Sequence, residues 1–370
     1  MVILNLEFNV IDQLQYHSRF SSKELDDQYN LRAGRPDYEA TVIPNWERKS
    51  ETVRQEIDCN LNIIYGSGEG QKLDIFHCGE KNAPTLLYFH GGYWQRGSKS
   101  IYSFLAKPYT STGVNVVIVG YDLCPKVTIT RISEEAREAI LFLWKKGKEF
   151  SLNPNHMVVM GHSAGGHITQ MMMGTKWSNL DRRVPNDLIK AGIPISPLSY
   201  LEPVRLTGAL NAGIQMDKLE AEGQSPMTKH APVTNAPQLV AVGGSETTEF
   251  HRQAKMYVEA YNSSERIIEF FEGHEYLILP STQVSPFDVE KEWVREINGQ
   301  ELGSYLDWMS ICCIISLFGL PALSLPCGFD SQGLPVGLQI VGKPRGDLDV
   351  LQAAFAIERA LKLDTRPTLL

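Results

Sequence analysis

The residues best suited to chemistry lie in the pentapeptide Gly161-His162-Ser163-Ala164-Gly165. An apolar run, residues 157–160, precedes it, and a helical pattern over residues 164–173 follows it. Strand, sharp turn and helix in that order push a serine hydroxyl out at the edge of a parallel sheet, and the glycines leave room for a strained turn. We therefore predict that Ser163 is the nucleophile of an acyl-transfer reaction.

Such a nucleophile needs a base that takes its proton and an acid that orients the base. On a strand–turn–helix nucleophile the chain order is serine, acid, histidine. Glu246 stands on a Gly-Gly turn after the apolar run 238–242, and we predict it as the acid; a solvated loop glutamate is the alternative. Glu249 is a weaker candidate because it falls in the next helical pattern. His274 follows the apolar run 266–271, no histidine lies beyond it, and we predict it as the base.

The negative charge that develops on the substrate oxygen requires backbone N–H donors. One is expected from the residue after the nucleophile, Ala164. The other is expected from a glycine-rich loop after an early strand, and residues 88–94 (Tyr-Phe-His-Gly-Gly-Tyr-Trp) form such a loop. We predict that Gly91 and Gly92 supply it, because glycine lets a backbone amide face the substrate without a side chain in the way.

Three other side chains of this loop have predicted roles. His90 is expected to hold the loop by hydrogen bonding rather than to carry protons. Tyr93 and Trp94 are predicted to line the substrate pocket, with core packing as the alternative.

The composition argues against several classes of protein. The chain of 370 residues carries a net charge of −8 without a basic cluster, which argues against a nucleic-acid surface. Its six cysteines lack zinc-site spacing, and the predicted chemistry requires neither a metal nor a cofactor. The N-terminus lacks the basic region of a signal peptide, and the apolar stretch 311–326 is too short and too broken to cross a membrane. We expect a cytoplasmic protein that acts on small molecules.

Short apolar runs alternate with helical patterns along most of the chain, which predicts an α/β fold with a doubly wound, mostly parallel sheet. Residues 1–60 are rich in charge and predict one or two amphipathic helices, and residues 61–274 form the predicted catalytic core. The helices expected in this core are 133–146, 164–173 and 249–262. The expected strands are 57–64, 72–77, 85–89, 114–121, 157–160, 191–195, 238–242 and 266–271.

Residues 275–370 have a different texture and predict an appended helix–hairpin–helix segment. The expected helices are 290–297, 301–318 and 347–361, and the expected strands are 322–326 and 336–341. Unpaired strand edges are costly or aggregation-prone. We therefore predict that these two strands either extend the catalytic sheet or pair across a homodimer.

Three motifs together resemble the kynurenine formamidase-like esterases of the α/β-hydrolase superfamily: residues 90–94, 161–166 and 243–253. Residues 25–30, 46–50 and 211–226 are also similar to segments of that family. The resemblance implies an α/β-hydrolase fold. It also implies that Ser163, Glu246 and His274 hydrolyse carboxylic esters or small aryl amides without a cofactor.

The C-terminal segment resembles a different family. Residues 279–284, 319–329 and 333–342 look like the C-terminal portion of amidase-signature enzymes. That family's catalytic lysine and serines lie in an upstream Gly/Ser-rich region that has no counterpart here, so the segment is expected to be structural or pocket-shaping. The junction falls at His274, and formamidase-like chains often carry their histidine two residues later, where this chain has Tyr276. Either His274 serves from a shifted loop or the triad is damaged.

Three functions follow from these residues. The leading prediction is a serine carboxylesterase that hydrolyses short-chain or aryl esters through an acyl-Ser163 intermediate. Formamides need the same machinery, so an arylformamidase acting on N-formylkynurenine is the second. The third is a catalytically impaired fusion that acts as an interaction protein.

Overall fold

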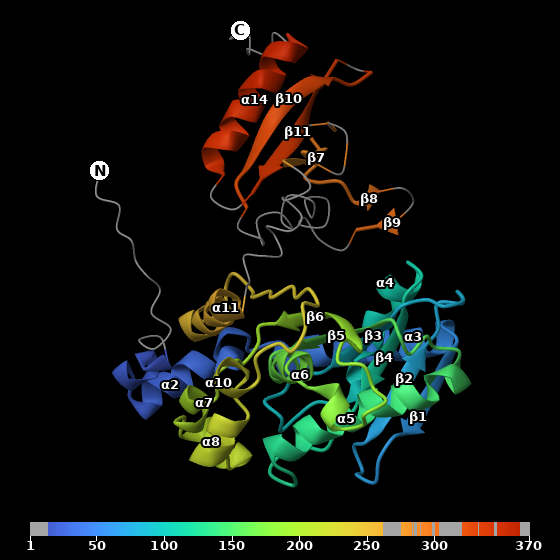
Figure 1. Cartoon of the computed structure of the whole chain (residues 1–370), viewed down its shortest axis with the longest axis vertical. Helices are drawn as coiled ribbons and strands as arrows, with labels where there is room; N and C mark the ends of the chain where they lie inside the picture. The colour runs from blue at the N-terminus through green and yellow to red at the C-terminus, as the bar shows by residue number, and fades with distance from the viewer. Residues whose placement is uncertain are drawn as a thin grey trace. The chain divides into compact units, whose positions relative to one another are not determined.

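The computed structural model of the chain describes residues 14–261, 275–282, 284, 287–288, 290–297, 300–302, 320–331, 333–343 and 346–362. The chain divides into two compact units, Met1–Tyr261 and Asn262–Leu370, which we call the N-terminal and the C-terminal unit. Figure 1 labels the elements of both. Each unit is described separately.

A six-stranded sheet forms the centre of the N-terminal unit, in the order β1-β2-β4-β3-β5-β6. The first two strands are antiparallel to their neighbours, whereas β3, β4, β5 and β6 run parallel to one another. The predicted mostly parallel sheet is therefore confirmed. The strands are β1 (Cys59–Ile64), β2 (Lys72–Phe76), β3 (Thr85–Phe89), β4 (Asn115–Val119), β5 (Met157–His162) and β6 (Ile189–Ile195).

Both faces of this sheet are covered, which explains its nearly continuous apolar strands. All five residues of β3 and of β4 are buried. Along β3, Leu87 and Phe89 join a core cluster that includes side chains from helices α5 (Ile129–Lys146) and α6 (Ala164–Met173). Leu86 and Tyr88 face the other way, into a cluster with side chains from α3 (Ile43–Glu56) and α4 (Ala106–Thr110). The alternation follows from the two-residue period of a strand.

Local signals start several of these helices. Ser21 and Glu24 form a capping box at the start of α2 (Ser22–Tyr29), and Thr128 accepts a hydrogen bond from a backbone N–H at the start of α5. Pro44 lies in the first turn of α3, where its missing N–H costs nothing. Short 3₁₀ or π turns complete the unit: η1 (Tyr16–Arg19), η2 (Leu31–Gly34), η3 (Tyr38–Val42), η4 (Lys99–Leu105), η5 (Gly147–Phe150) and η6 (Trp177–Asn179).

A group of mostly short helices gathers beside the β6 edge of the sheet (Figure 1). Helix α2 contacts α7, α8 and α11 within this group, although α2 and α11 are about 220 residues apart in the sequence. The chain thus brings its N-terminal region against segments that follow the nucleophile. The helices that join α2 here are α7 (Glu202–Arg205), α8 (Ala209–Ile214), α9 (Lys218–Gly223), α10 (Pro226–Lys229) and α11 (Thr248–Tyr261).

The strand predicted at residues 238–242 is only partly formed. Gln238 and Ala241 make two isolated parallel bridges to β6, and the segment between them is not a continuous strand. Pro194 of β6 explains the gap, because proline has no N–H to donate to the adjoining segment. The strand predicted at residues 266–271 lies outside the described residues.

The C-terminal unit contains a three-stranded antiparallel sheet in the order β10-β11-β7. Helix α14 packs on one face, where Val350 and Ala354 meet Leu325 and Ile340. The hairpin and final helix agree with the predicted pattern, but β7 was not predicted. The elements are β7 (Tyr276–Pro280), β10 (Ala322–Phe329), β11 (Pro335–Gly342) and α14 (Asp347–Leu361).

One prediction for this unit is wrong, and another is half answered. Residues 290–297 are not helical: they lead into β8 (Glu296–Ile297), which pairs with β9 (Gln300–Glu301). Nearly all of the predicted helix 301–318 lies outside the described residues. Among described residues, β10 and β11 pair with each other and with β7 rather than with the six-stranded sheet. No described helix combines the length and the apolar character that crossing a membrane would require.

Candidate active site

The nucleophile predicted from sequence lies on a strained turn between β5 and α6. Ser163 has φ +57° and ψ −117°, a conformation that L-residues rarely adopt. Its backbone N–H donates to the Ile195 carbonyl at 2.8 Å, and its own carbonyl accepts from the His167 N–H at 3.0 Å. Strain of this kind persists only where neighbouring contacts fix it, and it is common at reactive residues. The predicted strand–turn–helix is therefore confirmed.

The flanking glycines are required by close backbone approach. A Cβ atom built on Gly165 would lie 1.9 Å from the carbonyl oxygen of Phe89 on β3. One on Gly161 would lie 2.2 Å from the Gly165 carbonyl oxygen. Neither position can hold a larger residue without moving the elbow.

The loop after β3 lies against the nucleophile because β3 and β5 are neighbouring parallel strands, with Phe89 opposite Gly161. A Cβ atom on Gly91 would come within 3.3 Å of the Ser163 Cβ. Within the described part of the chain, the backbone N–H groups of Gly91, Gly92 and Ala164 make no hydrogen bond. These donors surround the place where a substrate oxygen would lie next to the nucleophile.

His90 has the structural role predicted for it. Its Nδ1 donates to the Gly91 carbonyl at 2.8 Å, its ring stacks on Tyr121 with centroids 4.3 Å apart, and the Tyr121 hydroxyl donates to the His90 carbonyl at 2.6 Å. Burial lowers the pKa of His90 to about 4. The ring is therefore neutral at physiological pH and holds the loop.

The acid predicted from sequence lies on the turn that leads into α11. One carboxylate oxygen of Glu246, Oε1, accepts from the Ser196 hydroxyl and from the Gly243 N–H at 3.1 Å. The other, Oε2, is buried and has no hydrogen-bond partner among the described residues. Ser196 follows β6 directly, and β6 is the strand next to β5. The carboxylate is thus fixed through one oxygen, while the second can still accept a proton donor.

Electrostatic effects connect Glu246 with the nucleophile loop. Burial lowers the pKa of His162, the residue before the nucleophile, and the negative charge of Glu246 acts in the opposite direction. Burial raises the pKa of the Tyr93 hydroxyl well above its usual range, and the same carboxylate adds to the rise. The carboxylate is therefore close enough to be felt on both sides of the site.

The predicted base, His274, lies outside the described residues. Tyr276, two positions later, already belongs to the C-terminal unit: it pairs with Gly342 in the β7–β11 ladder, and its hydroxyl donates to the Asp349 carbonyl at 3.2 Å. A histidine at position 276 would lie in that ladder. The role of His274 remains a prediction.

The two aromatic residues predicted to line the pocket have different environments. Trp94 is fully buried in the main core, with its ring 5.1 Å from that of His167 in an edge-to-face contact. Tyr93 is half-buried, and its hydroxyl donates to the Tyr29 carbonyl at 2.6 Å. Their contact with substrate remains a prediction.

Sequence reasoning missed Ser196, which holds the acid. The available signal was its place as the first polar residue after an apolar strand, on the edge where catalytic side chains collect. Glu249, the competing acid, lies inside α11 as expected and forms a buried ion pair with Arg252 at 2.6 Å. No cluster of three or more metal-ligating side chains occurs among the described residues.

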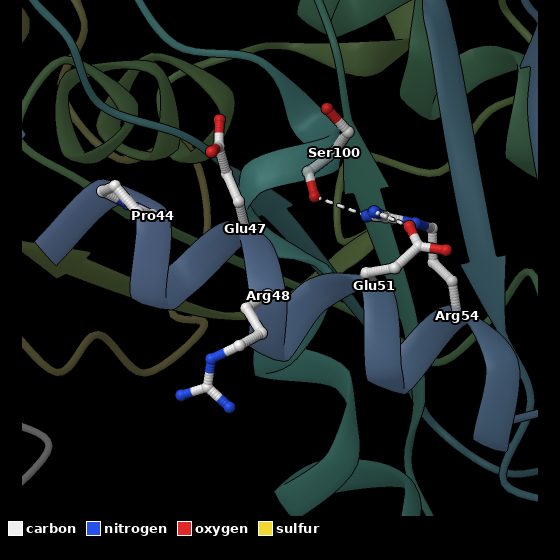
Figure 2. A pocket seen from close by; sticks show the side chains of 6 residues that line it. All are labelled: Pro44, Glu47, Arg48, Glu51, Arg54 and Ser100. Carbon is white, nitrogen blue, oxygen red and sulfur yellow. Dashed lines mark hydrogen bonds and ion pairs between the residues drawn. The ribbon is translucent and has the colours of Figure 1, made fainter. Parts of the chain in front are cut away.

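A surface hollow beside α3 offers no comparable chemistry. Figure 2 shows Arg54 directed at the Ser100 carbonyl and at Glu51, with distances of 2.6 Å in both cases. Its charges are therefore engaged in structure. The hollow is lined by Pro44, Glu47, Arg48, Glu51, Arg54 and Ser100, without a histidine or cysteine.

Comparisons with known proteins agree with this geometry. The BD-FAE family model matches residues 73–191. The kynurenine formamidase of Salmo salar is 30% identical over 244 residues, covering 64% of this chain and 80% of that protein. The chain belongs to the kynurenine formamidase family. The Danio rerio enzyme of this family is also 30% identical, over 60% of this chain and 75% of that protein. The chain is therefore an enzyme of the serine hydrolase type.

A solved structure supports the α/β-hydrolase fold of this family. A protein from Silicibacter sp. tm1040, provisionally described as a thioesterase, matches with a TM-score of 0.55 and 33% identity. The match covers 65% of this chain and 87% of that one. The fold implied by the sequence motifs is confirmed.

The resemblance of the C-terminal segment to amidases is also confirmed. The Amidase family model matches residues 214–351. The glutamyl-tRNA(Gln) amidotransferase of Moorella thermoacetica has an amidase-like polypeptide that is 43% identical over 97 residues, which is 26% of this chain but only 18% of that protein. The chain thus spans less than a fifth of that relative's length.

Proposed function

We propose that this enzyme is a serine carboxylesterase that cleaves short-chain or aryl esters through an acyl-Ser163 intermediate. The observation that carries the proposal is the geometry of Glu246: one oxygen is fixed by Ser196, and the other is buried and unpartnered among described residues. A buried carboxylate oxygen without a donor is costly. The N–H of a catalytic histidine is the donor that this chemistry supplies.

In the proposed cycle, His274 takes the proton from the Ser163 hydroxyl as its oxygen attacks the substrate carbonyl carbon. The N–H groups of Gly91, Gly92 and Ala164 stabilise the resulting oxyanion. The C–O bond to the alcohol then breaks, and the imidazolium donates its proton to the leaving oxygen. Water repeats the sequence on the acyl-enzyme and releases the acid.

A second candidate is an arylformamidase acting on N-formylkynurenine or similar aryl amides. It is favoured by the name of the relatives from Salmo salar and Danio rerio. The same residues would act, with an arylamine in place of the alcohol. We place the ester first because an aryl alcohol leaves more readily than an arylamine and so demands less of the site.

The test compares kcat/KM of the full-length protein on p-nitrophenyl acetate, p-nitrophenyl butyrate and N-formylkynurenine, with Ser163→Ala as control. We expect ester turnover that Ser163→Ala abolishes while the thermal melting curve is retained. A kcat/KM for N-formylkynurenine above that for both esters selects the second candidate. Absent turnover, together with no labelling of Ser163 by a fluorophosphonate probe, selects the impaired fusion acting as an interaction protein.

A further inference from the structure

The C-terminal end of α2 contacts both loops on which the proposed chemistry depends. The Tyr93 hydroxyl, from the oxyanion loop, donates to the Tyr29 carbonyl at 2.6 Å. The Thr247 hydroxyl, from the acid turn, donates to the Gln28 carbonyl at 2.7 Å. The last carbonyls of a helix have no partner within it, so they are available to such donors. Two adjacent carbonyls thus bind two loops that are over 150 residues apart in the sequence.

The Gln28 side chain adds a second connection to the acid turn. Its Oε1 accepts from the Thr248 hydroxyl at 2.9 Å and from the Glu249 N–H at 3.3 Å. These residues begin α11, and N–H groups in the first turn of a helix need an external acceptor. Gln28 therefore caps α11 from another helix, directly after Glu246.

The Tyr29 side chain anchors this end of α2. It is only 2% exposed, and its hydroxyl donates to Glu249 Oε2 at 2.9 Å and accepts from Gln253 Nε2 at 2.7 Å. Arg252 neutralises the carboxylate of Glu249 through a second pair of hydrogen bonds. The anchor is buried and its polar atoms are paired, so it can hold the backbone carbonyls in place.

The oxyanion loop needs such support. Tyr93 and Trp94 have φ of +51° and +56°, so two successive L-residues occupy the left-handed region directly after Gly91 and Gly92. Each strained residue costs roughly 1–3 kcal/mol unless its surroundings fix it. The Tyr93 hydroxyl bond is one of the contacts that fix it.

We propose that Gln28 and Tyr29 are positioning residues that hold the oxyanion loop and the acid turn in register with Ser163. The proposal rests on the serine hydrolase function proposed above. Gln28 acts through Thr248 and α11 on Glu246, and the Tyr29 carbonyl acts through Tyr93 on the oxyanion donors. Neither residue touches the reacting atoms.

A matched pair of variants tests Gln28. Gln28→Met removes the acceptor at nearly constant shape, and we expect kcat on p-nitrophenyl acetate to fall about threefold to tenfold, the worth of one hydrogen bond, with KM within about twofold. The acidic limb of kcat/KM against pH should also shift, because the acid no longer holds the base in the same way. Gln28→Glu keeps an oxygen acceptor and should restore both. Lys23→Met, exposed on the same helix, is the control. Equal kcat in Gln28→Met and wild type would overturn the role of Gln28.

A double-mutant cycle tests whether the two loops are coupled through α2. Tyr93→Phe and Thr247→Val each remove one hydroxyl donor. Coupling predicts that their combined loss in kcat differs from the product of the single losses, and that hydrogen exchange at residues 90–96 accelerates in Thr247→Val. Independent effects with unchanged exchange would overturn the proposal. Accelerated exchange in a protein without any turnover would refute the hydrolase function while retaining the mechanical coupling.

Discussion

The two units of this chain bury their sheets to very different degrees. Every residue of β3 and β4 in the N-terminal unit is buried, because helices cover both faces. In β10 of the C-terminal unit only Leu325 is buried, and helix α14 covers one face. A catalytic serine must be held in a strained conformation, which requires rigid packing on all sides. The difference indicates why chemistry is built on the first unit and why the second, an amidase fragment, serves structure.

The sharpest way to break this contrast is to disable the acid of the N-terminal unit. Glu246→Gln keeps the size of the side chain but replaces an oxygen acceptor by an amide, so the base loses its orientation. We expect kcat to fall by about 10³–10⁴, as when the acid of a serine triad becomes an amide. Ester hydrolysis by stopped assay checks it, with the exposed Glu222→Gln as control. A loss below tenfold would return Glu246 to the role of a loop glutamate.

Matched core deletions test whether the two units are independent. Ile118 in β4 and Ile340 in β11 are both fully buried. Replacing either with alanine should destabilise its own unit by about 2–5 kcal/mol. Thermal unfolding and esterase activity distinguish them: Ile118→Ala should reduce both, whereas Ile340→Ala should leave kcat/KM unchanged. If Ile340→Ala abolishes activity, the C-terminal unit is part of the catalytic machinery.

The pH dependence of stability should differ between the units. Burial lowers the pKa of His167 to about 3 and that of His90 to about 4, from 6.5 in the unfolded chain. The unfolded state therefore binds protons first, and stability that is complete above pH 6.5 is lost as the pH falls toward 4. Each ring contributes about 1.4 kcal/mol per pH unit in that window.

Urea unfolding between pH 7 and 5, followed by tryptophan fluorescence, measures this loss. His167→Gln should reduce the slope by the share of one histidine, whereas the exposed His156→Gln should not. The sequence has no histidine after position 274, so the C-terminal unit should unfold with little pH dependence in this range. An unchanged slope in His167→Gln would show that this ring is protonated in the folded state.

The smallest effect is expected on the surface of α14. Leu348, Leu351 and Phe355 are 65%, 55% and 60% exposed and lie on one side of the helix. The predicted homodimer through the C-terminal unit remains a proposal, and Phe355→Glu tests it. Stability should change by less than about 0.5 kcal/mol, while sedimentation should shift from dimer to monomer. A monomeric wild-type protein would refute the homodimer.

Short-range patterns were sufficient for much of the fold. The boundaries predicted for α6 and α14 are those observed, since helical periodicity and flanking glycines are local properties. The strand at residues 238–242 was overestimated, because whether a strand forms depends on its neighbour, here the proline in β6. Residues 290–297 were misjudged as helical for a related reason: charge-rich sequence without strong periodicity says little about pairing.

The amino-acid sequence by itself determined the nucleophile, its elbow and the oxyanion glycines, because tight turns are governed by the sterics of adjacent residues. The tertiary structure alone decided that Ser196 holds Glu246 and that Gln28 and Tyr29 bind two distant loops. Those contacts join backbone and side-chain groups far apart in the chain. Their formation depends on where packed helices place a carbonyl or a hydroxyl, which no local pattern encodes.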